Sequence, residues 1–248
     1  MNILLLNPNM TAGMTEAMTR VALGAVGPGT VLKPVTAETG FPYISSRTEA
    51  QVAGGIALEM IARHQHEVDA VVIAAFGDPG LLAARELFDL PVVGMAEAAM
   101  ISALMLGQRF AFVTFTRHMR PWYEQSVQQA GLQSRFAGVR TPDVGFQSVA
   151  TVQDELFDAL RGLVQQAVDE DGADVVILAG APLAGLAQRY TDAPAVLVDP
   201  ISAAVTQAEA LARLAPRGAH AGSFARPPGK ASVGLPSALA AWIARPDA

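Results

Sequence analysis

Two stretches of the chain share one pattern, DAVVIAAFGDPGL at Asp69–Leu81 and ADVVILAGAPLAGL at Ala173–Leu186. Each begins with a run of Val and Ile, the composition of a strand that is covered on both faces of a parallel sheet. Each run then passes into Gly, Ala and Pro, which end a strand in a loop, and a helical pattern follows. Loops at the carboxyl ends of parallel strands bind small molecules in open α/β folds. The pattern therefore predicts an α/β protein with ligand-binding loops after these two strands.

The same order of segments occurs twice along the chain. Asn2–Thr11 resembles Arg109–His118, and Leu90–Gly94 resembles Ala193–Val198. The halves are offset by 104 positions at the central pair of segments and by 103 at the last pair. We expect an α/β fold of two pseudo-symmetric three-layer subdomains, each with a short parallel sheet flanked by helices, and an active-site cleft between them.

Helical segments set the boundaries of these subdomains. Apolar residues at helical spacing predict helices over Thr11–Ala22, Ala96–Met105, Ile201–Leu214 and Pro236–Ile243, the last after a loop at Gly218–Gly234. The helix after the second half's final strand can pack back onto the first half. We therefore assign residues 1–95 and about 205–248 to the first subdomain, and 96–204 to the second.

Composition excludes several classes of function. The 248 residues carry 17 Lys and Arg against 23 Asp and Glu, a net charge of −6, and no basic run, so we expect no nucleic-acid partner. No apolar run resembles a signal peptide or reaches the ~20 residues of a membrane span, so we expect a cytoplasmic protein without membrane contacts. The absence of cysteine excludes disulfides, thiolate metal sites and a cysteine nucleophile.

The loop after the first strand offers amide and hydroxyl groups at Asn7, Asn9 and Thr11. The Asn side chains supply donors and acceptors, and the first amides of the following helix favour a carboxylate or an amide oxygen. A turn that caps this helix explains the same residues. Ligand binding and capping therefore both stay open for this loop.

Four side chains are candidates for acid–base catalysis, and each has a structural alternative. Asp78 serves as a general base or as an Asx-turn residue, and His118 as a catalyst or as a solvated loop histidine. Glu97 begins a helix, where the helix dipole favours a carboxylate in any case. Tyr43 lies in a polar segment after Gly40 and completes the set.

Substrate contacts are expected from several loops. Arg47 either clamps a substrate carboxylate or pairs with Glu49 on the surface. Threonine hydroxyls can bind an anion, and small residues let backbone amides approach an oxyanion, although packing alone also explains small residues. The other expected contacts are Ala75, Phe76, Thr114, Thr116, Gly180, Ala181 and Pro182.

Metal and cofactor sites have little support in the sequence. His64 and His66 lack a third ligand at a sensible spacing, and a polar helix end explains them better. No glycine-rich nucleotide-binding loop follows a strand. We expect neither a metal nor a cofactor.

Several motifs resemble the aspartate/glutamate/hydantoin racemase superfamily, above all its hydantoin and allantoin racemase branch. They are Asn7-Pro8-Asn9, FGDPGL at Phe76–Leu81, PVVG at Pro91–Gly94 and GAPLAGL at Gly180–Leu186, so the resemblance reaches to about Leu214. It implies two α/β subdomains and cofactor-free racemisation. Two cysteines on opposite faces of the substrate then remove and return the proton next to a carbonyl, and anion-binding loops stabilise an enolate-like intermediate. It also makes a homo-oligomer an expectation.

The chain departs from this family at both expected cysteines. The resemblance places them at Ala75 and at Gly180, or at Ala181 if the alignment shifts by one. Neither alanine nor glycine can move a proton, so the two-thiol mechanism is impossible here. Deliberate removal and natural divergence both explain the change, and glycine at the second position favours divergence.

Two classes of function stay open. The first is an enzyme that acts on a small carbonyl compound, such as a hydantoin, ureide, amino acid or related carboxylate, through an enolate-type intermediate. Asp78, Glu97, His118 or Tyr43 would then replace the thiols. One-base reactions such as decarboxylation, C–N lyase chemistry, tautomerisation or hydrolysis become favoured over racemisation. The second is a non-catalytic protein that binds a small molecule with carboxylate, amide or ureide groups. A metal-dependent hydrolase has little support.

Overall fold

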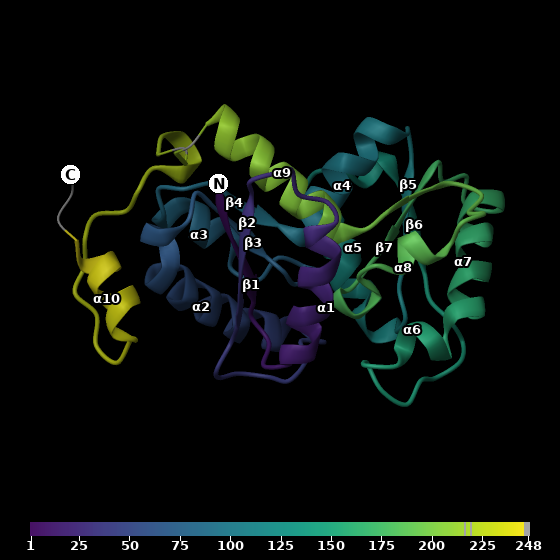
Figure 1. Ribbon diagram of the computed structural model, residues 1–248, viewed down its shortest axis with the longest axis horizontal. Coiled ribbons are helices and arrows are strands. Elements are labelled where there is room, and N and C mark those ends of the chain that lie inside the picture. The colour runs from purple at the N-terminus through teal and green to yellow at the C-terminus, as the bar shows by residue number, and fades with distance from the viewer. Residues whose placement is uncertain (216, 219, 246–248) are drawn as a thin grey trace.

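The computed structural model describes residues 1–215, 217–218 and 220–245, and it contains two parallel four-stranded sheets (Figure 1). The first sheet has the order β2-β1-β3-β4, and the second has the order β6-β5-β7-β8. The identical orders confirm the predicted α/β fold of two pseudo-symmetric subdomains. The strands are β1 (Asn2–Asn7), β2 (Val31–Thr36), β3 (Ala70–Ile73), β4 (Val92–Gly94), β5 (Phe110–Val113), β6 (Phe136–Arg140), β7 (Val175–Leu178) and β8 (Val196–Val198).

The central strands are buried because their side chains are apolar on both faces. Every residue of β3, β5 and β7 is buried, and β1 is buried from Ile3 onward. Helices cover both faces of a parallel sheet, so such strands carry no exposed polar face. The edge strands β2 and β6 are mostly half-exposed, and β2 contains Lys33 and Pro34.

Ten α-helices surround the sheets in the described part of the chain. They are α1 (Ala12–Leu23), α2 (Arg47–His64), α3 (Leu81–Leu87), α4 (Met95–Leu106), α5 (Arg120–Gln129), α6 (Val152–Glu155), α7 (Phe157–Asp169), α8 (Leu186–Arg189), α9 (Pro200–Leu214) and α10 (Ser237–Ala244). The ends of α1, α4, α9 and α10 lie within two residues of the sequence predictions. The predicted loop at Gly218–Gly234 contains one short 3₁₀ turn, Gly222–Phe224. Residues 216, 219 and 246–248, which the sequence assigned to the first subdomain, lie outside the described residues.

Two helices cross between the sheets. The chain enters α4 from β4 of the first sheet, yet α4 packs against β5, β7 and β8 of the second. The chain enters α9 from β8 of the second sheet, yet α9 packs against β1, β3 and β4 of the first. The two helices also pack against each other, and α9 runs across the top of the view in Figure 1. Alanine accounts for four of the six buried residues of α4 and four of the eight of α9, and its small side chain lets the helices approach closely.

The C-terminal helix α10 lies against α2 at the outer side of the first sheet (Figure 1). The buried carboxylate of Glu59 accepts a hydrogen bond from the amide of Leu239 at 2.9 Å. The indole nitrogen of Trp242 donates to the carbonyl oxygen of Leu87 at 3.0 Å. Among the described residues, no helix combines the length and apolar character that a membrane crossing requires.

Candidate functional site

The strand order of each sheet marks one place for a ligand. In the order 2-1-3-4 the connections leave the first strand in opposite directions, and open α/β sheets bind ligands in the crevice beyond the carboxyl ends of the strands at such a point, here the first and third strands. In the first sheet, Asn7 ends β1 and Ala75 lies two residues after β3. In the second sheet, Thr114 follows β5 and Gly180 lies two residues after β7. The expected thiol positions are therefore equivalent positions in the two subdomains.

Tyr123 on α5 lies between the loops that carry these two positions. Its ring centroid is 4.7 Å from that of Phe76, the neighbour of Ala75. On the other side, a Cβ atom at Gly180 would lie 3.5 Å from the Tyr123 hydroxyl oxygen. Tyr123 is fully buried. A phenol therefore occupies the space beside the second missing thiol.

Tyr123 is not predicted from the sequence, because no local motif surrounds it. Its place in the candidate site depends on how α5 packs against two loops distant in the chain. Burial raises the pKa of Tyr123 well above its usual value, and the nearby Tyr43 raises it further, while a hydrogen bond with Thr114 opposes both. The hydroxyl is thus protonated at neutral pH and acts as a hydrogen-bond donor.

Tyr43, a predicted candidate, reaches the same place from the first subdomain. Its hydroxyl donates to the sulfur of Met119 at 3.1 Å, and its ring centroid is 6.2 Å from that of Phe115. Burial, and secondarily the charge of Glu49, raises the pKa of Tyr43 far above its usual value. The structure therefore brings Tyr43 and Tyr123 together from opposite subdomains.

The loop at Gly180 is shaped around the absence of a side chain. Gly180 has φ +121° and ψ 137°, a region that residues with a Cβ atom rarely adopt. A Cβ atom there would lie 2.9 Å from Cε1 of Phe115. Thr114 donates to the carbonyl oxygen of Ala179 at 2.8 Å, and Gln153 donates to that of Pro182 at 2.9 Å. A side chain at position 180 would therefore be strained by the backbone and crowded by Phe115, and the origin of the cysteine absence stays open.

The predicted polar groups of the first loop bond mainly to one another. Asn7 donates to the side chains of Asn9 and Thr15, and the Asn9 side chain accepts from the amide of Thr11 at 3.0 Å. The Thr11 hydroxyl donates to the carbonyl oxygen of Pro42 at 2.6 Å. These bonds describe a turn that starts α1, although Thr11 makes no side-chain cap. Ligand contact by this loop stays a prediction.

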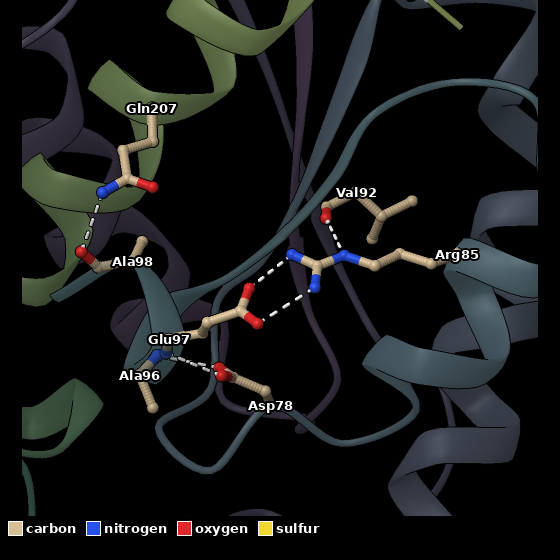
Figure 2. Close-up of polar contacts among 7 residues, drawn as sticks. All are labelled: Asp78, Arg85, Val92, Ala96, Glu97, Ala98 and Gln207. Carbon is tan, nitrogen blue, oxygen red and sulfur yellow. Dashed lines mark hydrogen bonds and ion pairs between the residues drawn. The ribbon is translucent and has the colours of Figure 1, made fainter. Parts of the chain in front are cut away.

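Asp78 and Glu97 lie together at the start of α4, as Figure 2 shows. Asp78 accepts from the amides of Ala96 and Glu97 at 2.8 Å each, and Arg85 pairs with the Glu97 carboxylate and donates to the carbonyl oxygen of Val92. Burial raises the pKa of Asp78 to about 7, while the two amide donors lower it. Both carboxylates are thus engaged in structural contacts that tie the Asp78 loop to α4, and catalysis by either stays a prediction.

The remaining predicted residues lie elsewhere. Arg47 is exposed and bridges to the second subdomain, donating to Gln125 at 2.5 Å and to the carbonyl oxygen of Pro121 at 2.9 Å. His118 is exposed and lines a separate cavity of about 800 Å³ beside Arg140. Thr116 precedes the 3₁₀ turn Arg117–Met119 and is half-buried. Among the described residues, no three His, Cys, Asp or Glu side chains gather as metal ligands would.

Comparison with known proteins identifies the family. The Asp/Glu/Hydantoin racemase model matches residues 3–208. A hydantoin racemase of Paenarthrobacter aurescens is 33% identical over 92% of this chain and 98% of its own length. The allantoin racemase structure from Klebsiella pneumoniae is 33% identical with a TM-score of 0.89, covering 96% of this chain and 98% of that one. That from Pseudomonas fluorescens is 31% identical with a TM-score of 0.86, covering 94% and 100%. These matches confirm the resemblance noted in the sequence, and the chain belongs to the Asp/Glu/hydantoin racemase family, in the hydantoin and allantoin racemase-like branch of these isomerase-type enzymes.

Proposed function

We propose that this protein is a cofactor-independent, hydantoin-racemase-like enzyme that acts on a small carbonyl compound of the hydantoin or ureide class. Its chemistry passes through an enolate-type intermediate without the two-thiol mechanism. Family membership supports the substrate class. The observation that carries the chemistry is Tyr123, whose hydroxyl lies 3.5 Å from the position of a Cβ atom at Gly180.

A buried, protonated phenol can perform two tasks at this position. It can donate a hydrogen bond to a carbonyl oxygen, which stabilises negative charge as an enolate develops. It can also give its proton to a carbanion on the face that Gly180 adjoins, after which solvent returns a proton to the phenolate. The raised pKa suits both tasks, since the hydroxyl stays protonated until charge develops beside it.

The two faces of the substrate then differ. Ala75 offers no acid or base, so the predicted base that would take the α-proton of a hydantoin is Asp78, three residues later. The carboxylate oxygens of Asp78, however, accept hydrogen bonds from the amides of Ala96 and Glu97. A racemase needs a proton-transfer group on each face, whereas a reaction with one protonation step needs only one. This asymmetry favours a second candidate, the decarboxylation of a carboxylated substrate. The C–C bond then breaks to release CO₂, and the electron pair left on carbon takes the Tyr123 proton.

The experiment is turnover in D₂O, followed by NMR, with 5-substituted hydantoins, allantoin and substituted malonates. We expect deuterium to enter at the α-carbon, or a malonate to lose CO₂, with the rate reduced at least tenfold in Tyr123→Phe. Tyr190→Phe is the matched control, because this second-subdomain tyrosine donates instead to the carbonyl oxygen of Phe157 at 2.7 Å. Ligand-induced stabilisation without turnover of any compound would contradict the proposal and indicate a non-catalytic binding protein.

A further inference from the structure

Two tyrosine hydroxyls, one from each subdomain, converge on one sulfur atom. The hydroxyl of Tyr43 lies 3.1 Å from Sδ of Met119, and that of Tyr123 lies 3.5 Å from the same atom. Met119 is 2% exposed and ends the 3₁₀ turn before α5. Both phenols therefore donate toward the same buried sulfur atom, in the region that follows β5 and β7.

A thioether is a poor partner for two buried hydroxyls. Methionine sulfur is a weak acceptor, whereas a carbonyl oxygen accepts two hydrogen bonds. Buried polar groups in folded proteins are normally well satisfied, because an unmade hydrogen bond is costly in a low-dielectric interior. Each phenol has a single O–H donor, and in the unliganded protein it is directed at this weak acceptor, although Tyr123 also forms a hydrogen bond with Thr114. Methionine is flexible and can move aside for a better acceptor.

We propose that Tyr43 and Tyr123 form a two-donor subsite for one carbonyl oxygen of the ligand, and that the sulfur of Met119 marks this oxygen's place in the unliganded protein. This subsite rests on the proposed function, since it assumes a small carbonyl ligand at the crevice. A ligand bound in this way joins the subdomains, because Tyr43 belongs to the first and Tyr123 to the second. The two tyrosines are then substrate-binding residues, and neither occupies a position where the family has a catalytic cysteine.

The surroundings favour a neutral carbonyl over a free carboxylate. The aromatic rings of Phe115 and Phe76 lie beside Tyr43 and Tyr123 respectively, and Gly180 offers only backbone. The charged group that acts on Tyr43 is the carboxylate of Glu49, which repels an anion. An unpaired anion in such surroundings is costly, whereas a neutral carbonyl gains both hydrogen bonds. The subsite therefore prefers a cyclic ureide to its ring-opened acid.

Calorimetric titration of the full chain tests this subsite, with 5-methylhydantoin as the neutral probe and N-carbamoylalanine as its ring-opened acid. We expect the hydantoin to bind at least tenfold tighter than the acid. Tyr43→Phe and Tyr123→Phe should each weaken hydantoin binding about tenfold, while Tyr190→Phe should not change it. Met119→Leu should bind the hydantoin as tightly as the wild type or up to about fivefold tighter, because it removes the competing acceptor.

Circular dichroism and thermal unfolding of each variant verify that it is folded, and a tyrosine ultraviolet difference spectrum supplies a second measurement. The spectral change on binding should shrink in each Tyr→Phe variant. If the hydantoin binds both Tyr→Phe variants as tightly as it binds the wild type, the subsite alone is overturned. Weaker binding by Met119→Leu, equal to the loss in the Tyr→Phe variants, would also overturn it. Failure of every carbonyl probe to bind the wild type would overturn the proposed function together with the subsite.

Discussion

Replacing Gly180 with alanine tests whether the loop after β7 requires glycine at this position. The backbone of Gly180 has φ +121° and ψ 137°, and an L-residue held there costs about 1–3 kcal/mol. The added Cβ atom lies 2.9 Å from Cε1 of Phe115, a fully buried ring, and such overpacking costs about 1–3 kcal/mol. Alanine restricts the unfolded chain and returns about 0.4–1 kcal/mol. We expect Gly180→Ala to lower the free energy of unfolding by about 3 kcal/mol.

Urea unfolding at 25 °C measures this loss, and two variants separate its causes. Gly138→Ala is the control for backbone strain, because Gly138 has φ +140° and a Cβ atom there meets nothing within 4 Å. Phe115→Leu withdraws the ring edge, so the double variant with Gly180→Ala should recover about 1 kcal/mol or more relative to additive losses. Unchanged stability of Gly180→Ala, or a loss equal to that of Gly138→Ala with no coupling to Phe115, would refute the reasoning.

Three further predictions follow from contacts outside this loop. Because burial raises the pKa of Asp78 to about 7, its contribution to stability should fall as pH rises from about 4 to 7, by at most ~1.4 kcal/mol per pH unit. Urea unfolding over this pH range should show the slope in the wild type and lack it in Asp78→Asn. Arg47→Ala removes an exposed bridge between the subdomains, so global stability should change by less than about 1 kcal/mol while amide hydrogen exchange at residues 41–46 quickens. Leu239→Ala should cost about 2–3 kcal/mol and expose α10 to proteolysis, whereas Leu235→Ala, at a side chain that is 45% exposed, should do neither.

The sequence predicts the parts of the fold that depend on local patterns. The Val and Ile runs at Val71–Ile73 and Val175–Ile177 lie in β3 and β7, because a strand buried on both faces needs a continuous apolar run. The edge strands β2 and β6 are not predicted from the sequence, because their half-exposed positions tolerate Lys33, Pro34 and Gly138 and leave no continuous apolar run.

The site was less predictable because its contacts are long-range. Tyr43 was found as a polar residue in a loop, yet its partner Met119 lies 76 positions later in the chain. Tyr123 lies on a helix, and only the packing of α5 places it beside Phe76 and Gly180. Asp78 was recognised as a turn residue or a base, but the amides that it binds are 18 and 19 positions away.

The crossed helices α4 and α9 determine when the protein can complete its fold during synthesis. The face of the first sheet on which α9 packs is only partly covered, by α1, until the ribosome has added Leu214, although all four strands of that sheet precede Met95 in the chain. The nascent first half must therefore keep its apolar strands from aggregating while the second half is translated. For the same reason, a chain cut between α4 and β5 yields an N-terminal fragment without α9 and a C-terminal fragment without α4. Only reassociation of the two fragments places each helix back on its sheet.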